Sequence, residues 1–484
     1  MRTKFLLAVL CGLLGVLFSS VSAAQSVPQS VCLITDVGIL NDGGFNQSAY
    51  DGMQRAVEEF GLDDTFIETQ APSDYEENIQ TCLDSDFDVI ITVGFALADA
   101  TYEAALINTD NFFIGVDQDF LSADPLPNLV GLQFREDQGG FLAGTMAALM
   151  TESDIVGGVY GPAIFPVVKF RNGFEQGVAY TNADVTVLGN YSESFETPTE
   201  GAEVALTMIG DGADVIFGAG GRHGTGAIRR AAEEGTWVIG VDLDQYFTDF
   251  GGGEAPGADR IVTSVVKGVD NGVYDMIVAA IEDGVYPANS TYVLEIANGG
   301  IGFTPSHDAD VPDAVIEQVQ ATLDGLGDGS IVTGVDPVTG DLLDPIPVVA
   351  AAAGDFSTLL AAADAAGLVD TLTDDGPFMV LAPTDAAFNA ALDALGMTAE
   401  EILADTDLLT DILTYHVYDM ALTETLILNV GGGEIEMLNG DTLTIALTED
   451  GVMLNDSVMV TATDVHAANG VIHVIDGVLL PPTE

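Results

Sequence analysis

Basic residues are almost absent from this sequence of 484 residues, in which 11 lysines and arginines face 76 aspartates and glutamates, a net charge of −65. Such a polyanion repels phosphate backbones and anionic lipid surfaces, so the composition excludes nucleic acid as a partner. Because salt screens repulsion between surface charges, the acid excess indicates a saline exterior. Beyond Lys4 the only lysines are Lys169 and Lys267, and no lysine or arginine follows Lys267. We expect these two to be retained for a function, with chance retention or a core ion pair as the alternatives.

Long apolar runs are missing except at the start of the chain, where residues 1–24 have the pattern of a secretory signal peptide. Arg2 and Lys4 precede the apolar residues 5–18, and residues 21–23 or 22–24 fit the small-residue pattern of a cleavage site. No later segment is long and apolar enough to span a bilayer. We therefore predict an exported protein, periplasmic or extracellular, at the cell surface, with lipidation at Cys11 as the alternative to a soluble form.

Cysteine is scarce, and only Cys32 and Cys82 remain once the signal peptide is removed. An exported protein meets oxidising conditions, in which a disulfide between these two residues would persist. Cysteine is also among the most buried residue types, so two free thiols in the core fit the sequence equally well. The sequence leaves this alternative open.

Catalytic and metal-binding motifs are missing as well. The glycine-rich loop at residues 218–226 lacks the Gly-Lys-Ser/Thr ending of a P-loop, which argues against nucleotide hydrolysis. The sequence has no Gly-x-Ser-x-Gly elbow, and its five histidines show no metal-ligand spacing. We therefore expect a protein that is not an enzyme and that holds no cofactor or metal.

Residues 35–46 form the stretch that most suggests a ligand site. They lie between an apolar strand at residues 31–34 and a helix at residues 47–60, at the strand end where α/β sheets bind ligands. Asp36, Asn41 and Asp42 supply acceptors, and Phe45 offers a flat aromatic face beside Asn46. The stretch therefore suits a polar ligand with a flat ring. Capping of the following helix would explain the acids as well.

Strands and helices alternate twice along the chain, which predicts two α/β units with parallel sheets. Together they occupy residues 28–330. The second unit includes the glycine-rich loop, in which Gly220 and Gly221 are expected to contact the ligand. Residues 331–347 are rich in Gly, Asp and Pro and are expected to be a linker. A third, different domain is expected at residues 348–482.

The motifs of the two units resemble the basic membrane protein family, the purine nucleoside receptors of ABC importers. In chain order the matching segments are Asp36-Val37-Gly38 with Asn41-Asp42, residues 45–48, 94–95, 141–144, 169–174, 224–226, 238–246 and 264–270. The likeness covers about Gln29 to Gly329. It implies a type I periplasmic-binding-protein fold with two Rossmann-like lobes, a purine nucleoside between them, and ABC permease and ATPase subunits as partners.

The resemblance also implies roles for single residues. Phe45 and Phe217, one from each lobe, would stack on the two faces of the purine. Asp36 and Asp117 would contact the ligand from the first lobe, whereas Asp242 and Lys267 would hold the ribose. The chain would cross between the lobes near residues 125–135, 255–265 and 297–302, with the first hinge at residues 125–128.

The C-terminal region resembles a fasciclin domain, of α+β fold. The motifs that carry the resemblance are residues 382–388, 412–417 and 469–481. The family implies adhesion to a cell-surface or matrix partner. The expected function is therefore a purine nucleoside receptor with a module for adhesion or surface attachment. The alternatives are a receptor for another small aromatic or signalling ligand, and an adhesion protein whose receptor domain senses a ligand.

Overall fold

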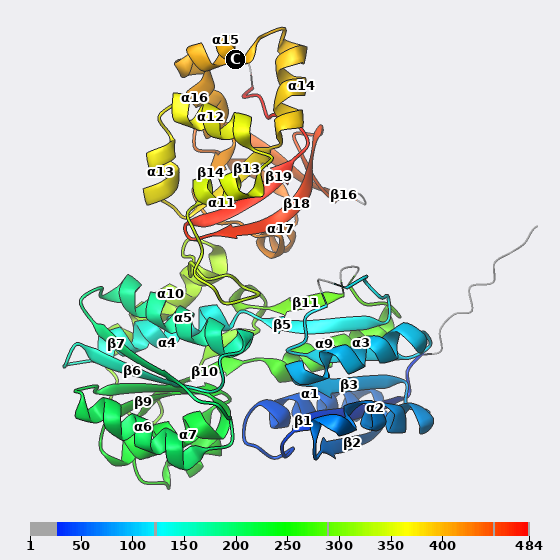
Figure 1. Cartoon of the computed structure of the whole chain (residues 1–484), viewed down its shortest axis with the longest axis vertical. Coiled ribbons are helices and arrows are strands. Elements are labelled where there is room, and N and C mark those ends of the chain that lie inside the picture. The colour runs from blue at the N-terminus through cyan, green and yellow to red at the C-terminus, as the bar shows by residue number, and fades with distance from the viewer. Residues whose placement is uncertain (1–26, 121–122, 288–289, 449–450, 483–484) are drawn as a thin grey trace, which may run out of the picture.

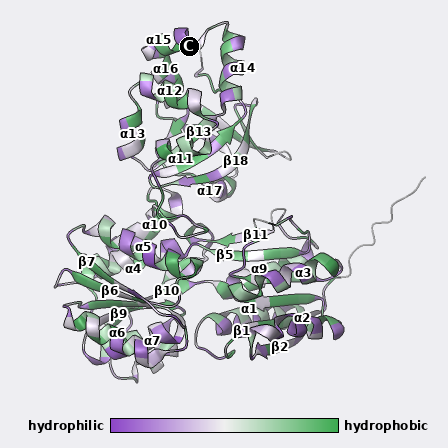
Figure 2. Cartoon of the chain, in the orientation of Figure 1, coloured by the Kyte–Doolittle hydropathy of each residue, from purple (hydrophilic) through white to green (hydrophobic). Residues whose placement is uncertain are grey.

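The computed structural model describes residues 27–120, 123–287, 290–448 and 451–482. The predicted signal peptide, with Cys11, lies outside these residues. The described chain forms two α/β lobes side by side and a C-terminal domain stacked on them (Figure 1). Hydrophobic residues are concentrated on the central strands (Figure 2), as sheets covered on both faces require. No helix in the described ranges is long and apolar enough to cross a membrane.

The first lobe is built on a parallel sheet with the strand order β11-β5-β4-β3-β1-β2. Residues 31–34 are fully buried because helices cover both faces of the sheet, α1 and α9 on one and α2 and α3 on the other. The bounds are β1 Ser30–Val37, β2 Asp63–Thr69, β3 Val89–Val93, β4 Phe112–Val116, β5 Leu129–Phe134, β11 Thr291–Leu294, α1 Phe45–Phe60, α2 Tyr75–Asp84, α3 Ala98–Ile107 and α9 Val269–Glu282.

The second lobe repeats this plan with the strand order β12-β10-β9-β8-β6-β7, in which only β12 is antiparallel to its neighbour. Helices α4, α5 and α10 cover one face, and α6 and α7 cover the other. The bounds are β6 Ile155–Tyr160, β7 Thr186–Tyr191, β8 Val215–Ala219, β9 Trp237–Asp242, β10 Ile261–Lys267, β12 Ile301–Phe303, α4 Glu136–Met150, α5 Phe165–Thr181, α6 Pro198–Gly210, α7 Gly221–Glu233, α8 Gln245–Thr248 and α10 Asp313–Asp328.

Three segments carry the chain between the lobes, and we call them the hinge: Arg135 between β5 and α4, Gly268 between β10 and α9, and residues 295–300 between β11 and β12. The first predicted hinge, at residues 125–128, is wrong, because it connects β4 and β5 within one sheet. The second crossing lies after the predicted range 255–265, because β10 continues through Lys267.

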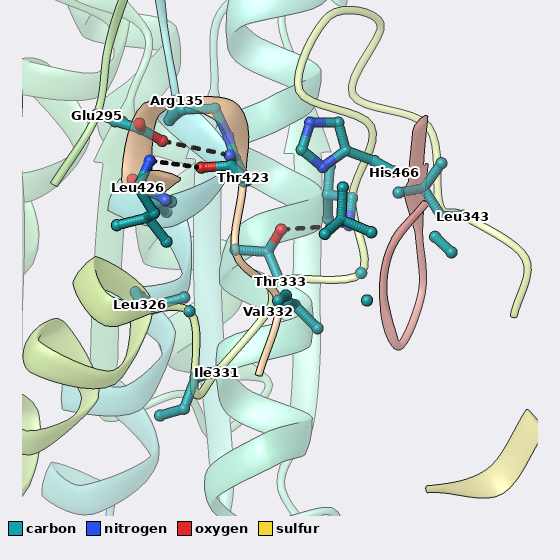
Figure 3. A pocket seen from close by; sticks show the side chains of 18 of the residues that line it. Arg135, Glu295, Leu326, Ile331, Val332, Thr333, Leu343, Thr423, Leu426 and His466 are labelled. Carbon is teal, nitrogen blue, oxygen red and sulfur yellow. Dashed lines mark hydrogen bonds and ion pairs between the residues drawn. The ribbon is translucent and has the colours of Figure 1, made fainter. Parts of the chain in front are cut away.

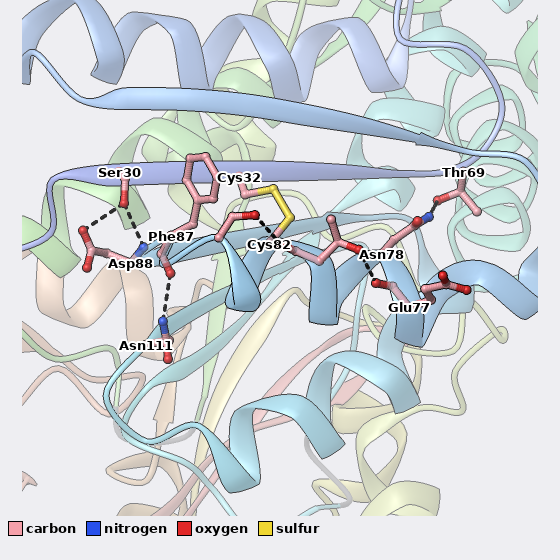
Figure 4. Close-up of a disulfide and its surroundings, with 11 residues drawn as sticks. Ser30, Cys32, Thr69, Glu77, Asn78, Cys82, Phe87, Asp88 and Asn111 are labelled. Carbon is pink, nitrogen blue, oxygen red and sulfur yellow. Dashed lines mark hydrogen bonds between the residues drawn. A yellow bond between two sulfur atoms is a disulfide. The ribbon is translucent and has the colours of Figure 1, made fainter.

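A disulfide joins Cys32 of β1 to Cys82 of α2, with 6.0 Å between the two Cα atoms (Figure 4). Both residues are buried in the core between α2, α3 and the sheet. The bond ties α2 to the central strand of the first lobe, and it settles the alternative that the sequence left open.

The C-terminal domain has a mixed sheet with the order β14-β13-β19-β18-β17-β16-β15. One core lies under α11 to α16, and a second lies between the sheet and α17. The bounds are α11 Ile346–Ala353, α12 Ser357–Ala365, α13 Val369–Asp374, α14 Asp385–Leu395, α15 Ala399–Ala404, α16 Thr406–Thr414, α17 Glu424–Val430, β13 Phe378–Pro383, β14 Val417–Tyr418, β15 Gly433–Glu436, β16 Thr442–Thr448, β17 Gly451–Leu454, β18 Val458–Ala467 and β19 Gly470–Ile475.

The segment between α10 and α11, predicted as a linker at residues 331–347, is packed against both neighbours, and we call it the strap. The Thr333 hydroxyl donates to Asp137 Oδ2 at 2.6 Å, and the Asn172 side chain donates to the Gly340 carbonyl at 2.6 Å. On the other side, the Ala468 amide donates to the Asp344 carbonyl at 2.9 Å. The strap therefore holds the C-terminal domain against the lobes.

Candidate ligand-binding site

A cleft with about 1200 Å³ of space lies between the lobes. The carboxyl ends of parallel strands face it from both sides, which is where open α/β sheets bind ligands. Asp36 comes from β1, Asp117 follows β4, and Asp242 ends β9. The predicted site residues that line the cleft are Asp36, Asp42, Phe45, Asn46, Asp117, Gly220, Gly221, Asp242 and Lys267.

Lys267 is the buried cation of the cleft and the last residue of β10. Its Nζ lies 2.8 and 2.7 Å from the two carboxylate oxygens of Asp117 and 2.8 Å from Oε1 of Glu136. It also lies 4.9 Å from the centre of the Phe45 ring. Burial disfavours the ammonium, but Asp117 and Glu136 outweigh burial and raise the pKa of Lys267 above its ordinary value. Lys267 is therefore charged, and it ties the first lobe to the start of α4.

Lys169, the other lysine past the signal peptide, lies beneath the cleft and does not line it. Its Nζ is 2.6 Å from Oε2 of Glu136 and donates to the Phe134 carbonyl at 2.7 Å. Glu136 is fully buried between the two lysines. Burial alone would raise the pKa of Glu136, but Lys169 and Lys267 together lower it. Of the alternatives left open for Lys169, the structure shows the core ion pair.

Asp242 and Asp117 share an unusual backbone conformation at the ends of their strands. Their φ angles are +69° and +57°, in the left-handed region that costs non-glycine residues energy. Burial raises the pKa of Asp242 to about 6, and the negative charge of Asp117 adds to this, although Lys267 opposes it. Among the described residues, no hydrogen bond to another side chain occupies the Asp242 carboxylate. It is therefore a free acceptor at the cleft wall.

Asp42 is a cap of α1. Its carboxylate accepts the backbone N–H groups of Gly44 at 2.9 Å, Asn46 at 3.0 Å and Gln47 at 3.2 Å. These bonds satisfy amide groups that the first helical turn leaves without partners. They also fix the turn that presents Phe45 to the cleft. Asn41, the preceding residue, is exposed and does not line the cleft. The capping role, which the sequence left open, accounts for Asp42.

Asn46 and Asp36 present acceptors to the cleft from the first lobe. The Asn46 side chain donates to the Ile39 carbonyl at 3.3 Å, while its Oδ1 is buried without a partner. The Asp36 carboxylate accepts the hydroxyl of Tyr75 and the amide of Val37. Because a buried acceptor without a partner is costly, Asn46 Oδ1 suits an N–H donor of a ligand.

Phe217 does not line the cleft, which corrects the prediction of a sandwich between Phe45 and Phe217. It is fully buried in the second lobe, with its ring stacked on Phe174 at 5.2 Å and edge-on to Tyr160 and Phe170 at 6.2 Å. Side chains alternate along a strand, and this position of β8 faces α4 and α5 rather than the strand end.

Phe195, which the sequence analysis missed, lines the cleft from the second lobe. It lies in the loop between β7 and α6, just before Pro198 opens the helix. A side chain at Gly161 or Gly221 would meet its ring, so these glycines leave room for it, and Gly220 itself packs against Gly161. The signal in the sequence was an aromatic residue in a polar loop that precedes a helix, as at Phe45.

Two α/β lobes joined by a three-segment hinge, with acceptors and one buried lysine on the walls of the cleft between them, define a two-lobe solute receptor. Within the described residues, no three His, Cys, Asp or Glu side chains gather as metal ligands would.

The chain belongs to the PnrA-like family of ABC transporter substrate-binding proteins, whose profile matches residues 29–333. The fasciclin domain profile matches residues 354–481. The chain is 36% identical over 251 residues to basic membrane protein A of Borreliella burgdorferi, covering 51% of this chain and 70% of that protein. It is 28% identical over 332 residues to the ABC transporter nucleoside-binding protein BmpA of Lactococcus lactis, covering 66% and 93%.

A solved solute-binding protein of an ABC transporter system from Aeropyrum pernix shares the fold, with a TM-score of 0.55 and 24% identity over 64% of this chain and 94% of that one. The predicted family, the α/β fold class and the C-terminal fasciclin domain are confirmed. Members of this family are binding proteins that work outside the cytoplasm, and the chain is accordingly a binding protein and not an enzyme.

Proposed function

We propose that the chain is the receptor of an ABC importer and binds a purine nucleoside between its lobes. The observation that carries the proposal is that Phe45 and Phe195, one from each lobe, line a cleft whose walls also hold Asp242 and Lys267. Stacking of a base on an aromatic ring contributes about 1–3 kcal/mol per base. The printed name of the Lactococcus lactis relative, a nucleoside-binding protein, supports the same ligand class.

The polar groups of the cleft suit a nucleoside better than a nucleotide. The free carboxylate of Asp242 can accept hydrogen bonds from two neighbouring sugar hydroxyls, and Asn46 Oδ1 can accept from a ring N–H. Lys267 is already neutralised by Asp117 and Glu136, so it offers a phosphate little attraction. The remaining acids would repel a phosphate in this partly desolvated space.

Calorimetric titration of the full chain tests this proposal. We expect adenosine, guanosine or inosine to bind, and the matching 5′-monophosphate to bind at least tenfold more weakly. Free bases should bind more weakly than nucleosides, because they leave Asp242 without donors. If none of the nucleosides binds, the proposal is refuted, and a binding screen of other small aromatic metabolites then addresses the alternative ligand class.

We also propose that the fasciclin domain attaches the protein to a cell-surface or matrix partner. The proposed transport partners are an ABC permease and its ATPase. Binding of the labelled full chain to cells of the source strain tests the attachment. Uptake of labelled nucleoside by those cells, with and without the gene, tests the transport. Binding without uptake would favour an adhesion protein that senses its ligand.

A further inference from the structure

The fasciclin domain rests on the hinge as well as on the strap. Figure 3 shows Arg135 and Glu295, from two of the three hinge segments, facing Thr423, Leu426 and His466 of the fasciclin domain. We call this contact region the seam. Backbone bonds close it at its edge, where the Ala421 amide donates to the Gly329 carbonyl at 2.8 Å. The domain therefore touches the residues whose backbone angles change if the lobes move.

A buried ion network ties the two hinge segments together. Arg135 donates from Nε and Nη2 to the two carboxylate oxygens of Asp137, each at 2.8 Å. Its Nη1 lies 3.7 Å from Oε2 of Glu295. Arg135 is 9% exposed and Asp137 is fully buried. Because breaking a buried ion pair leaves an uncompensated charge, rearrangement of either segment affects the other.

The same network continues into the strap and the fasciclin domain. Asp137 Oδ2 accepts the buried hydroxyl of Thr333 at 2.6 Å. The Thr425 side chain favours the charged form of Glu295, and Asp464 of β18 adds negative charge near Arg135. Through Asp137 the start of α4 is thus hydrogen-bonded to the strap, and Glu295 of the hinge segment 295–300 lies beside the fasciclin domain.

The apolar side of the seam is lined by Leu326, Ile331, Val332 and Leu426, which come from both sides of the contact. Because packed side chains transmit a displacement to their neighbours, a shift of the hinge reaches the fasciclin domain through them.

We propose that closure of the lobes and seating of the fasciclin domain are coupled through the network of Arg135, Asp137, Glu295 and Thr333. When the lobes close, the fasciclin domain takes the position seen here. When they open, the contacts of the seam weaken. By linkage, the seam in turn biases the lobes toward the closed state. The proposal depends on the proposed function only for the identity of the ligand that drives closure.

A cross-lobe disulfide tests the coupling without any ligand. A Cβ on Gly43 of the first lobe would lie 3.7 Å from the Cβ of Thr248 of the second lobe, which is the separation that a disulfide needs. The double variant Gly43→Cys with Thr248→Cys therefore locks the lobes when oxidised. Gly43 has a φ of +70°, at which a cysteine is strained, and the reduced form carries the same strain. Thr248 is exposed, whereas Cys32 and Cys82 are buried, so mild reduction opens the new bond alone. The reduced form is the matched control.

Hydrogen exchange of the full chain provides the readout. We expect locking to slow exchange of the amides of residues 421–426 and 464–468 at least threefold. Adding Thr333→Val or Glu295→Gln should abolish this effect of locking. Thr101→Val, which removes a buried hydroxyl bond inside the first lobe, should preserve it. Equal exchange in the locked and reduced forms would overturn the proposal, and so would an effect of locking that survives both seam variants.

Discussion

The affinity for a nucleoside should decrease as the pH is lowered, because Asp242 becomes protonated. This carboxylate lines the cleft and, in its charged form, is the acceptor proposed for the sugar hydroxyls. Burial raises its pKa to about 6, so protonation begins within a range where the protein can be handled. Protonation removes negative charge from the acceptor and adds a proton that competes with the hydroxyl donors.

The magnitude follows from the ionised fraction. A carboxyl group with a pKa of about 6 is almost fully ionised at pH 7.5 and about one-tenth ionised at pH 5. If only the ionised form binds, the dissociation constant rises about tenfold over this range, or about 1.4 kcal/mol. The raised pKa means that the charged form of Asp242 destabilises the folded state. Acid therefore weakens ligand binding but removes this destabilisation of the fold.

Calorimetry at pH 7.5, 6.5, 5.5 and 5.0, at one ionic strength, measures the effect. Constant salt is essential because the net charge of −65 makes every property of this chain sensitive to screening. The matched variant Asp242→Asn should bind weakly at all four values and depend on pH less than the wild type, because burial also raises the pKa of Asp117 and Asp42 in the same cleft. A wild-type affinity that stays constant from pH 7.5 to 5.0 would refute the role of Asp242.

Three further predictions concern the site and the stability of the two parts of the chain. Phe195→Ala should weaken nucleoside binding at least tenfold, because Phe195 lines the cleft. Phe217→Leu should lower the melting temperature but change the affinity less than twofold, because Phe217 is buried in the core. If calorimetry gives the reverse order, Phe217 belongs to the site. Replacing Cys32 and Cys82 by serine removes a bond with a sequence separation of 50, which should lower the stability of the first lobe by about 4 kcal/mol, and an unchanged urea midpoint would contradict this. Burial lowers the pKa of His416 from 6.5 to about 4, so the folded fasciclin domain favours the neutral histidine. The free energy of unfolding is therefore highest above pH 6.5 and falls by about 3 kcal/mol as the pH is lowered toward 4. Thermal unfolding should show a larger loss in the wild type than in His416→Gln, in which His466, whose pKa burial also lowers to about 4, still contributes.

Segments with strong patterns were predicted at or near their observed bounds. Helix α4 at residues 136–150 and strands β5 and β6 are apolar and bounded by polar or breaking residues, so the sequence pattern indicates the same bounds that the structure has. Strand β2 was missed because Asp63–Thr69 is a largely exposed strand at the sheet edge, with no apolar alternation. The sequence pattern of residues 356–373 is that of a single helix, but the structure has two helices there, because Gly367 takes a φ of +70° between them.

The cleft was predicted better for its polar residues than for its aromatic ones. Asp36, Asp117, Asp242 and Lys267 end or follow apolar strands, and the strand ends of parallel sheets meet at one edge. The direction of a side chain within a strand depends on how the sheet is covered, so the sequence did not reveal that Phe217 faces the core. The strap was also underestimated, because a segment rich in Gly, Asp and Pro resembles a free linker until its hydrogen bonds to both neighbours are known.

The most direct test of the proposed function is a crystal structure of the full chain with the tightest-binding nucleoside. We predict the base between Phe45 and Phe195 and the sugar hydroxyls on the Asp242 carboxylate, with Lys267 still paired to Asp117 or turned to the ligand. A nucleoside bound outside this cleft, or a base that contacts neither ring, would contradict the proposal.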